Sequence, residues 1–190
     1  VTGVQTCALP IYEPHDLPAP GRTEESEGGG EDLAIWPTYA RTAVEAIRKV
    51  DTRLPIYVAG NAWSAAMALA DSNPGFPLAG DNLVYEVHLY LDASSAGHAF
   101  DYETELRKGY SAGLGRRAID ADTGAKRLDM AVRWARKHNA RLALTEVGMP
   151  LDDERWQEMF LRTVTHALRT GVEVMSWMGG SHWPIRNYPI

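Results

Sequence analysis

The sequence lacks several features that mark whole classes of protein. No apolar run reaches the about 18 residues that a membrane-spanning helix needs, so we expect no membrane partner. The net charge is -6 and no basic face is present to neutralise phosphates, which argues against nucleic acid. The glycine run at 28–30 neither follows a predicted strand nor carries a lysine, so it is not a phosphate loop. None of the six histidines has metal-ligand spacing such as His-Glu-x-x-His, so we expect no metal site.

The start of the chain also lacks the marks of a natural N-terminus. Residues 1–11 have no initiator Met, no charged region and no long apolar stretch, so they are not a signal peptide. They match, codon for codon, the translation of a common sequencing adapter, and we expect them to be a non-native scar. The single cysteine, Cys7, lies within this scar and therefore gives no information on redox compartment. We expect the native part to be residues 12–190, with its true N-terminal region missing.

The remaining composition is that of an ordinary globular protein, with 45% hydrophobic and 23% charged residues. Six tryptophans are many for 190 residues. Their large flat faces suit binding to sugars, although tryptophan also fills hydrophobic cores.

Hydrophobic periodicity predicts alternating helices and strands. A loop at 92–124, with weak helical content at 102–108, interrupts the alternation, and Gly171 suits the position just after a helix end. The predicted strands are short and almost continuously apolar, which is typical of a parallel sheet covered by helices. The expected helices are 35–50, 64–70, one beginning near 125, and 156–168; the expected strands are 54–59, 83–91, 141–147 and 172–177.

Polar and aromatic residues gather where the predicted strands end. In a parallel α/β barrel, active sites lie at this carboxyl-terminal edge. Two of these residues are glutamates on different strands, and a pair of carboxyl groups is what glycoside hydrolysis requires, one as acid and one as nucleophile or base. The residues concerned are Glu13, Asn61, Trp63, His88, Tyr90, Glu146 and Trp177.

Five segments carry a more specific signal. Residues 13–18, Glu-Pro-His-Asp-Leu-Pro, resemble the end of the Asn-Glu-Pro-His motif of glycoside hydrolase family 5, the main cellulase family. The later segments resemble its next four signatures, in the same order. These are Gly60-Asn61-Ala62-Trp63-Ser64, Tyr85-Glu86-Val87-His88-Leu89-Tyr90-Leu91-Asp92, Thr145-Glu146-Val147-Gly148 and Ser176-Trp177-Met178-Gly179-Gly180.

The resemblance implies a fold and a reaction. The family has a (β/α)₈ TIM barrel, so residues 12–190 are expected to be the C-terminal half of a catalytic domain, from the end of strand four through strand eight. It also implies retaining hydrolysis of β-1,4-glucans without a cofactor. We expect the partner to be a polysaccharide or oligosaccharide, the protein to be a monomer, and its location to be extracellular or periplasmic. The half-barrel by itself is expected to be inactive.

By the same resemblance, Glu13 is the acid/base and Glu146 the nucleophile, with His88 and Tyr90 beside them. We expect the Tyr90 hydroxyl to donate a hydrogen bond to the Glu146 carboxylate and hold it ionised. Trp177 is expected to stack on a sugar, and Trp63 and Asn61 to bind substrate. The chain departs from the family at Tyr12, where the motif has Asn, and we interpret Tyr12 as an artefact of the adapter junction.

Structural interpretations remain open for each of these residues. Glu13 fits a solvated loop, Glu146 a structural ion pair, and His88 a core histidine bonded to a carbonyl. Trp63 fits plain packing and Asn61 a turn. At the level of function, the alternatives are another β-glycan hydrolase, such as a mannanase, xyloglucanase or β-1,3-glucanase, and a non-catalytic carbohydrate-binding protein.

Overall fold

The computed structural model describes residues 12–18, 31–111 and 116–177. The predicted scar at 1–11, the glycine run at 28–30 and the end of the last family-like segment lie outside these residues. No helix in the described part of the chain has the length and hydropathy needed to cross a membrane.

One parallel sheet organises the chain and confirms the predicted fold class. It contains β1 (Ile56–Val58), β2 (Leu83–Tyr90), β5 (Arg141–Gly148) and β6 (Glu173–Val174), in that spatial order. Each neighbouring pair is parallel. The carboxyl ends of these strands therefore point to one edge of the sheet.

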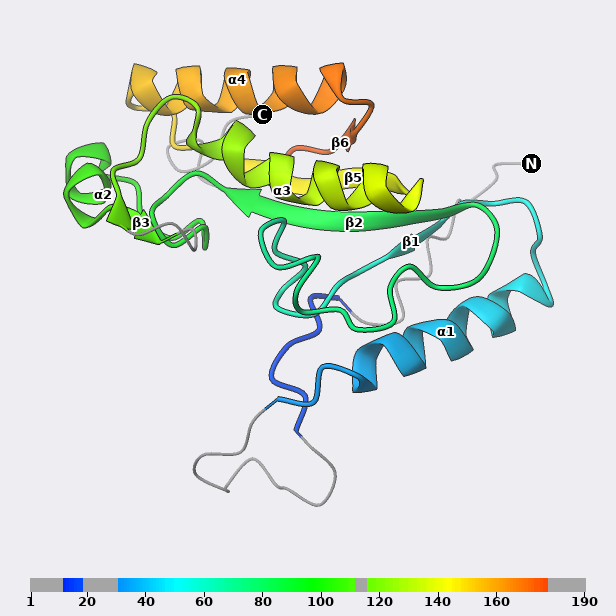
Figure 1. Ribbon diagram of the computed structural model, residues 1–190. Coiled ribbons are helices and arrows are strands. Elements are labelled where there is room, and N and C mark those ends of the chain that lie inside the picture. The colour runs from blue at the N-terminus through cyan, green and yellow to red at the C-terminus, as the bar shows by residue number, and fades with distance from the viewer. Residues whose placement is uncertain (1–11, 19–30, 112–115, 178–190) are drawn as a thin grey trace, which may run out of the picture.

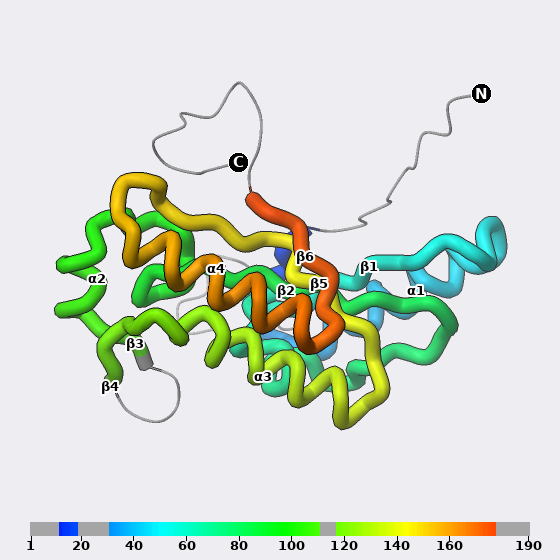
Figure 2. The backbone as a smooth tube through the Cα atoms, turned by 90° about the horizontal axis from the view of Figure 1, so that it is seen from above, coloured from blue at the N-terminus to red at the C-terminus, as the bar shows by residue number. Residues whose placement is uncertain are grey.

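Four helices accompany the sheet: α1 (Ile35–Arg48), α2 (Tyr102–Lys108), α3 (Thr123–His138) and α4 (Glu154–Arg169). The helices α3 and α4 lie side by side over one face of the sheet, as both views show (Figures 1 and 2). Helix α4 ends at Arg169, and Gly171 follows just after it with a φ of 77°, which glycine adopts without strain, as the sequence predicts. A short antiparallel hairpin of β3 (Tyr110–Ser111) and β4 (Arg116–Arg117), which the sequence analysis missed, follows α2.

The helix predicted at 64–70 does not form. Ala62, Trp63 and Ser64 have φ values of 56°, 55° and 54°, in the left-handed region, and turns follow them. The backbone instead pairs with the end of β2: the His88 amide donates to the Ser64 carbonyl and the Ala66 amide to the His88 carbonyl. Pairing with the sheet outweighs the local helical pattern, and it carries this segment to the edge where β2 ends.

The two faces of β2 have different roles because successive side chains alternate between them. Tyr85 faces the helices and packs edge-on against Trp134 of α3, with ring centroids 5.0 Å apart. Glu86, His88 and Tyr90 share the opposite face. Trp134 and Trp156 are buried in the core. The face of the sheet away from α3 and α4 therefore carries the polar residues.

Candidate active site

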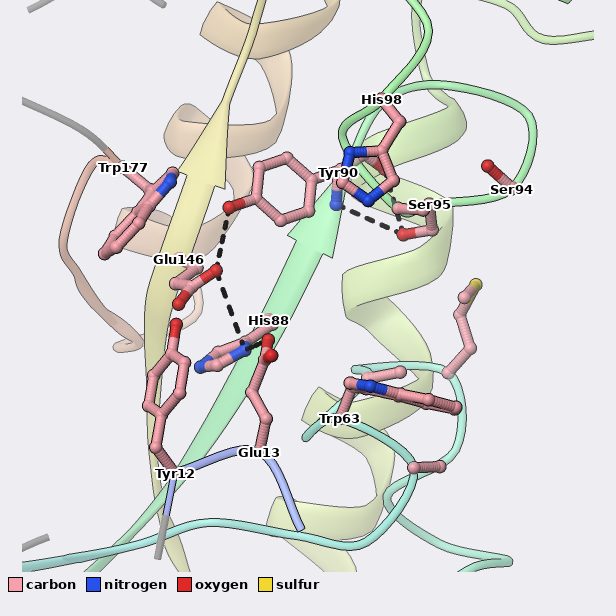
Figure 3. A pocket seen from close by; sticks show the side chains of 14 residues that line it. Tyr12, Glu13, Trp63, His88, Tyr90, Ser94, Ser95, His98, Glu146 and Trp177 are labelled. Atoms are coloured by element: carbon pink, nitrogen blue, oxygen red, sulfur yellow. Dashed lines mark hydrogen bonds and ion pairs between the residues drawn. The ribbon is translucent and has the colours of Figure 1, made fainter. Parts of the chain in front are cut away.

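A cleft of about 660 Å³ lies at the carboxyl edge of the sheet. Its lining includes six of the seven site residues predicted from the sequence (Figure 3). They come from the segment at 12–18, from the loop that follows β1, from strands β2 and β5, and from the last described residue of the chain. These six residues are Glu13, Trp63, His88, Tyr90, Glu146 and Trp177.

A chain of polar contacts links four of them. His88 Nδ1 is hydrogen-bonded to Glu13 Oε1 at 2.7 Å and lies 3.7 Å from Glu146 Oε2. The Tyr90 hydroxyl donates a hydrogen bond of 2.7 Å to the same Glu146 oxygen, as the sequence analysis expects. Figure 3 shows His88 between the two carboxyl groups. One imidazole thus connects both carboxylates.

A β-bulge places Glu146 opposite His88. Val87 pairs with Leu144, but the next residue, His88, pairs with Glu146, so Thr145 is an extra residue on β5. Such a bulge re-aims the side chain that follows it. Glu13 reaches the same point from a bend in which its own φ is 47°, a strained value for a residue with a Cβ.

Burial shifts the pKa values of titratable side chains in the cleft. Glu146 is 4% exposed, and desolvation raises its pKa to about 7. This direction is opposite to the one expected from the Tyr90 hydrogen bond, which favours the ionised carboxylate. Burial also lowers the pKa of His88, against the opposing influence of the Glu13 carboxylate.

A third carboxyl group, Glu86, lies beside the pair and was not identified from the sequence. It is 3% exposed, on the same face of β2 as His88. Burial, followed by the charge of Glu13, raises the pKa of Glu86 to about 7. The sequence could have indicated Glu86 as a cleft residue, because side chains alternate along β2 and residues 86, 88 and 90 therefore share one face.

The aromatic residues line the cleft and are partly exposed. Trp63 is 47% exposed and stacks on His15, with ring centroids 4.3 Å apart and planes 17° apart. Trp177 is 37% exposed, and its backbone amide donates to the Val147 carbonyl. Two flat apolar faces therefore border the carboxyl pair.

Asn61 does not line the cleft. It is 1% exposed, and its side-chain amide donates to the carbonyls of Leu33 and Ser72. Its backbone amide donates to the Asn73 side chain. These contacts give Asn61 a structural role in tying the loop after β1, in place of the substrate contact predicted from the sequence.

A buried arginine supports the end of β2. Arg127 of α3 is 2% exposed and donates to the carbonyls of Tyr90, Asp92 and Ala93. Gly97, with a φ of 72°, packs directly on the Tyr90 ring, where a Cβ would come within 2.7 Å of it. Arg127 and Gly97 thereby help to fix the position of Tyr90. No local sequence motif indicates this role.

Comparisons with known proteins show which family and fold the chain is similar to. A model of the family described as cellulase (glycosyl hydrolase family 5) matches residues 13–182. The manganese dependent endoglucanase Eg5A of Phanerodontia chrysosporium is 29% identical over 128 residues, which cover 60% of this chain and 30% of that protein.

Solved structures are similar as well. The endoglucanase Cel5A of Pseudomonas stutzeri is 27% identical with a TM-score of 0.71, and the match covers 93% of this chain and 48% of that one. The endo-beta-1,4-glucanase Xac0029 of Xanthomonas axonopodis pv. citri, 20% identical with a TM-score of 0.68, shares the fold over 93% of this chain and 50% of its own. The chain thus spans about half the length of these structures.

Proposed function

The chain belongs to glycosyl hydrolase family 5, and from this premise we propose that it supplies the catalytic carboxyl pair of an endo-acting β-1,4-glucanase. The observation that carries the proposal is the distance between the carboxyl groups. The side-chain oxygens of Glu13 and Glu146 that face His88 lie within 4.8 Å of each other.

This separation selects between two mechanisms. Retaining glycosidases hold their carboxyl groups about 5–5.5 Å apart, whereas inverting enzymes need about 6.5–9.5 Å to admit a water molecule. The short distance supports a double displacement with a covalent glycosyl-enzyme intermediate. No metal or redox group is needed in such a reaction.

Glu146 is the nucleophile in this proposal. It ends an apolar strand, and its Oε2 accepts the Tyr90 hydrogen bond that fixes the orientation of the carboxylate. Attack by Glu146 on the anomeric carbon forms the C–O bond to the enzyme while the bond to the leaving sugar breaks. In the second step, a water molecule attacks the anomeric carbon from the side that the leaving sugar vacated, and the bond to Glu146 breaks.

Glu13 is the acid/base. Its side chain is 26% exposed, so it reaches the open part of the cleft where a leaving sugar departs. It gives its proton to the leaving oxygen and then takes one from the attacking water. His88, between the two groups, fixes the orientation of Glu13 through the 2.7 Å contact.

The tryptophans suit a glucan chain. Pyranose rings present apolar C–H faces that stack on aromatic planes, and Trp63 and Trp177 border the carboxyl pair with such planes. The Pseudomonas stutzeri endoglucanase was solved with cellobiose, a β-1,4-linked glucose disaccharide. We extend that substrate class to this chain, and place the protein outside the cytoplasm because a polymer cannot enter the cell.

The activity is proposed for a closed barrel, since the described sheet is open at β1 and β6. Activity experiments therefore use residues 12–190 joined to the N-terminal strands of the Pseudomonas stutzeri endoglucanase, here called the closed-barrel protein. We expect Glu13→Gln to lower kcat on barley β-glucan by about 10²–10⁴-fold and Glu146→Gln by at least as much.

Glu45→Gln is the matched control because Glu45 is an exposed glutamate on α1, far from the cleft. Reducing-sugar release measures all three variants. Retention of kcat by both cleft variants, or an equal loss in Glu45→Gln, contradicts the proposal.

A further inference from the structure

Three side chains of the cleft bring one nitrogen and two oxygens to a common point. Glu13, His88 and Glu146 come from three separate segments, and their facing atoms all lie within 4.8 Å of one another. His88 Nδ1 stands between the two carboxyl groups, 2.7 Å from one and 3.7 Å from the other. The positions 13, 88 and 146 form no local motif, so a search for metal-ligand spacing in the sequence does not find them.

Among the described side chains, no lysine or arginine balances the charge around this point. Within residues 12–18, 31–110 and 117–177, neither cation forms an ion pair with Glu13, Glu86 or Glu146. Glu146 Oε1 is buried and has no hydrogen-bond partner among these residues, and the same holds for Glu86 Oε1. Hydrogen bonding therefore compensates the charge of the buried Glu146 carboxylate only in part, through Oε2, and a bound cation compensates it further.

We propose that Glu13, His88 and Glu146 form a site for a divalent transition-metal ion, with Zn²⁺ preferred, and that the bound ion inhibits the enzyme. One imidazole nitrogen with two carboxylate oxygens is a ligand set that Zn²⁺ accepts, leaving a fourth position for water. Mg²⁺ and Ca²⁺ take oxygen ligands and gain little from the imidazole, so they bind weakly here. The Irving–Williams order places Zn²⁺ above Mn²⁺ at the same site.

The three donors must move to hold the ion. Donors around a tetrahedral Zn²⁺ with bonds of about 2.0–2.1 Å lie about 3.3 Å apart. The two distances from His88 Nδ1, 2.7 Å to Glu13 and 3.7 Å to Glu146, lie on either side of this value, and the facing carboxylate oxygens lie within 4.8 Å of each other. Rotation of the partly exposed Glu13 side chain adjusts its distances to His88 and Glu146, and a small shift of the Glu146 carboxyl group shortens the remaining distance. The ion enters through the same cleft that the substrate uses.

Inhibition follows from which atoms the ion occupies. Zn²⁺ on Glu146 Oε2 takes the electron pair that attacks the anomeric carbon, and Zn²⁺ on Glu13 blocks proton transfer. Substrate and metal therefore exclude each other. The inhibition rests on the proposed function, whereas metal binding does not, so the two are separable by experiment.

The binding test uses the full 190-residue chain. Equilibrium dialysis against zinc sulfate at pH 7.5 is expected to show one site, and Zn²⁺ is expected to raise the melting temperature. Glu13→Gln, His88→Gln and Glu146→Gln should each weaken binding by more than about tenfold, since even outer-shell partners of a metal commonly contribute that much.

His98→Asn is the matched control, because His98 lines the same cleft but is outside the cluster. It should leave zinc affinity unchanged, and magnesium sulfate should not compete with zinc. Circular dichroism confirms that each variant retains the fold, and Glu146→Gln, which keeps the side-chain volume, decides the result where another variant unfolds. Equal zinc affinity in the wild type and Glu146→Gln, or an equal loss in His98→Asn, overturns the site.

The inhibition test uses the closed-barrel protein. Zinc should raise the apparent KM on β-glucan at constant kcat, and a chelator should restore it. Zinc binding with the expected variant pattern but no hydrolysis in any preparation keeps the metal site and refutes the proposed function. Hydrolysis that saturating zinc leaves unchanged refutes the inference and keeps the function.

Discussion

At the scale of single residues, burial and hydrogen bonding have opposite effects on the pKa of Glu146. Burial raises its pKa to about 7, while the Tyr90 hydroxyl donates to the ionised form and favours it. A nucleophile must be ionised, so kcat/KM should rise with pH through about 7. The local environment of one carboxylate thereby sets the acid limb of the pH profile.

Tyr90→Phe tests this balance. Loss of the hydroxyl removes a stabilising contact of the carboxylate, so the pKa of Glu146 should rise further and the acid limb should move upward by about one pH unit. The pH dependence of kcat/KM on an aryl cellobioside, measured with the closed-barrel protein, reports this shift. Tyr57→Phe is the matched control because Tyr57 makes a similar 2.6 Å hydrogen bond to Glu173, outside the cleft. An unmoved acid limb in Tyr90→Phe contradicts the assignment.

Glu86 makes a prediction about stability. Its folded-state pKa, about 7, lies above the ordinary value of 4.5 for a glutamate, so the folded chain holds its proton more tightly than the unfolded chain does. The stabilising effect is complete below about pH 4.5 and is lost as the pH rises toward 7. Glu86→Gln should therefore raise the free energy of unfolding by about 2–3 kcal/mol at pH 8 and leave it unchanged at pH 4.

Urea unfolding of the 190-residue chain at the two pH values measures this difference. A decrease in stability at pH 8 in Glu86→Gln would mean that the native state needs an ionised Glu86.

At the scale of elements, β2 and α3 act together to present Tyr90. Arg127 of α3 holds three successive parts of the chain after β2 through their carbonyl groups. The Glu105 side chain, 1% exposed, accepts from the Ala93 amide and so ties α2 to the same turn. The position of a cleft residue thus depends on contacts made behind the sheet.

Arg127→Met tests whether the position of Tyr90 depends on Arg127. The methionine fills similar volume but leaves three carbonyl groups without their donor, so we expect a loss of about 3 kcal/mol or more in the free energy of unfolding. In the closed-barrel protein kcat should fall more than KM changes, because the Tyr90 contact loosens. Arg136→Met, an exposed change on the same helix, should alter neither. A stable variant with normal kcat would show that the arginine does not position Tyr90.

The elements also show how far the sequence predicts the structure. Helices α1, α3 and α4 follow from apolar periodicity, because each buries one regular face. Strands β2 and β5 follow from almost continuous apolar runs, because both of their faces are buried. The segment at 62–70 does not follow, since its left-handed residues and its pairing with His88 are set by the neighbouring strand. Helix α2 matches the weak signal at 102–108, where Asp101 accepts from the Thr104 amide as a cap.

At the scale of the whole molecule, the sequence predicts the residues that line the cleft better than the residues that hold them in position. His88, Tyr90 and Glu146 meet because the carboxyl ends of parallel strands share one edge, which a strand assignment alone implies. Glu13 reaches the same edge from a bend, which no strand pattern predicts. Arg127 and Gly97 remain hidden in the sequence, since their roles arise from packing between elements, whereas the alternation of β2 does place Glu86 on the face of His88. Asn61 is assigned to substrate by the family resemblance, yet it is buried and its side-chain nitrogen donates to the carbonyls of Leu33 and Ser72.

The central claim is that Glu146 is the nucleophile of a retaining β-glucanase. The most direct measurement is covalent trapping of the closed-barrel protein with an activated 2-deoxy-2-fluoro-β-cellobioside, followed by peptide mass spectrometry. We expect one fluorocellobiosyl group on the peptide that contains Glu146, and none in Glu146→Gln. A label on Glu13, or hydrolysis of the natural glucan with inversion and no trapped intermediate, would contradict the account.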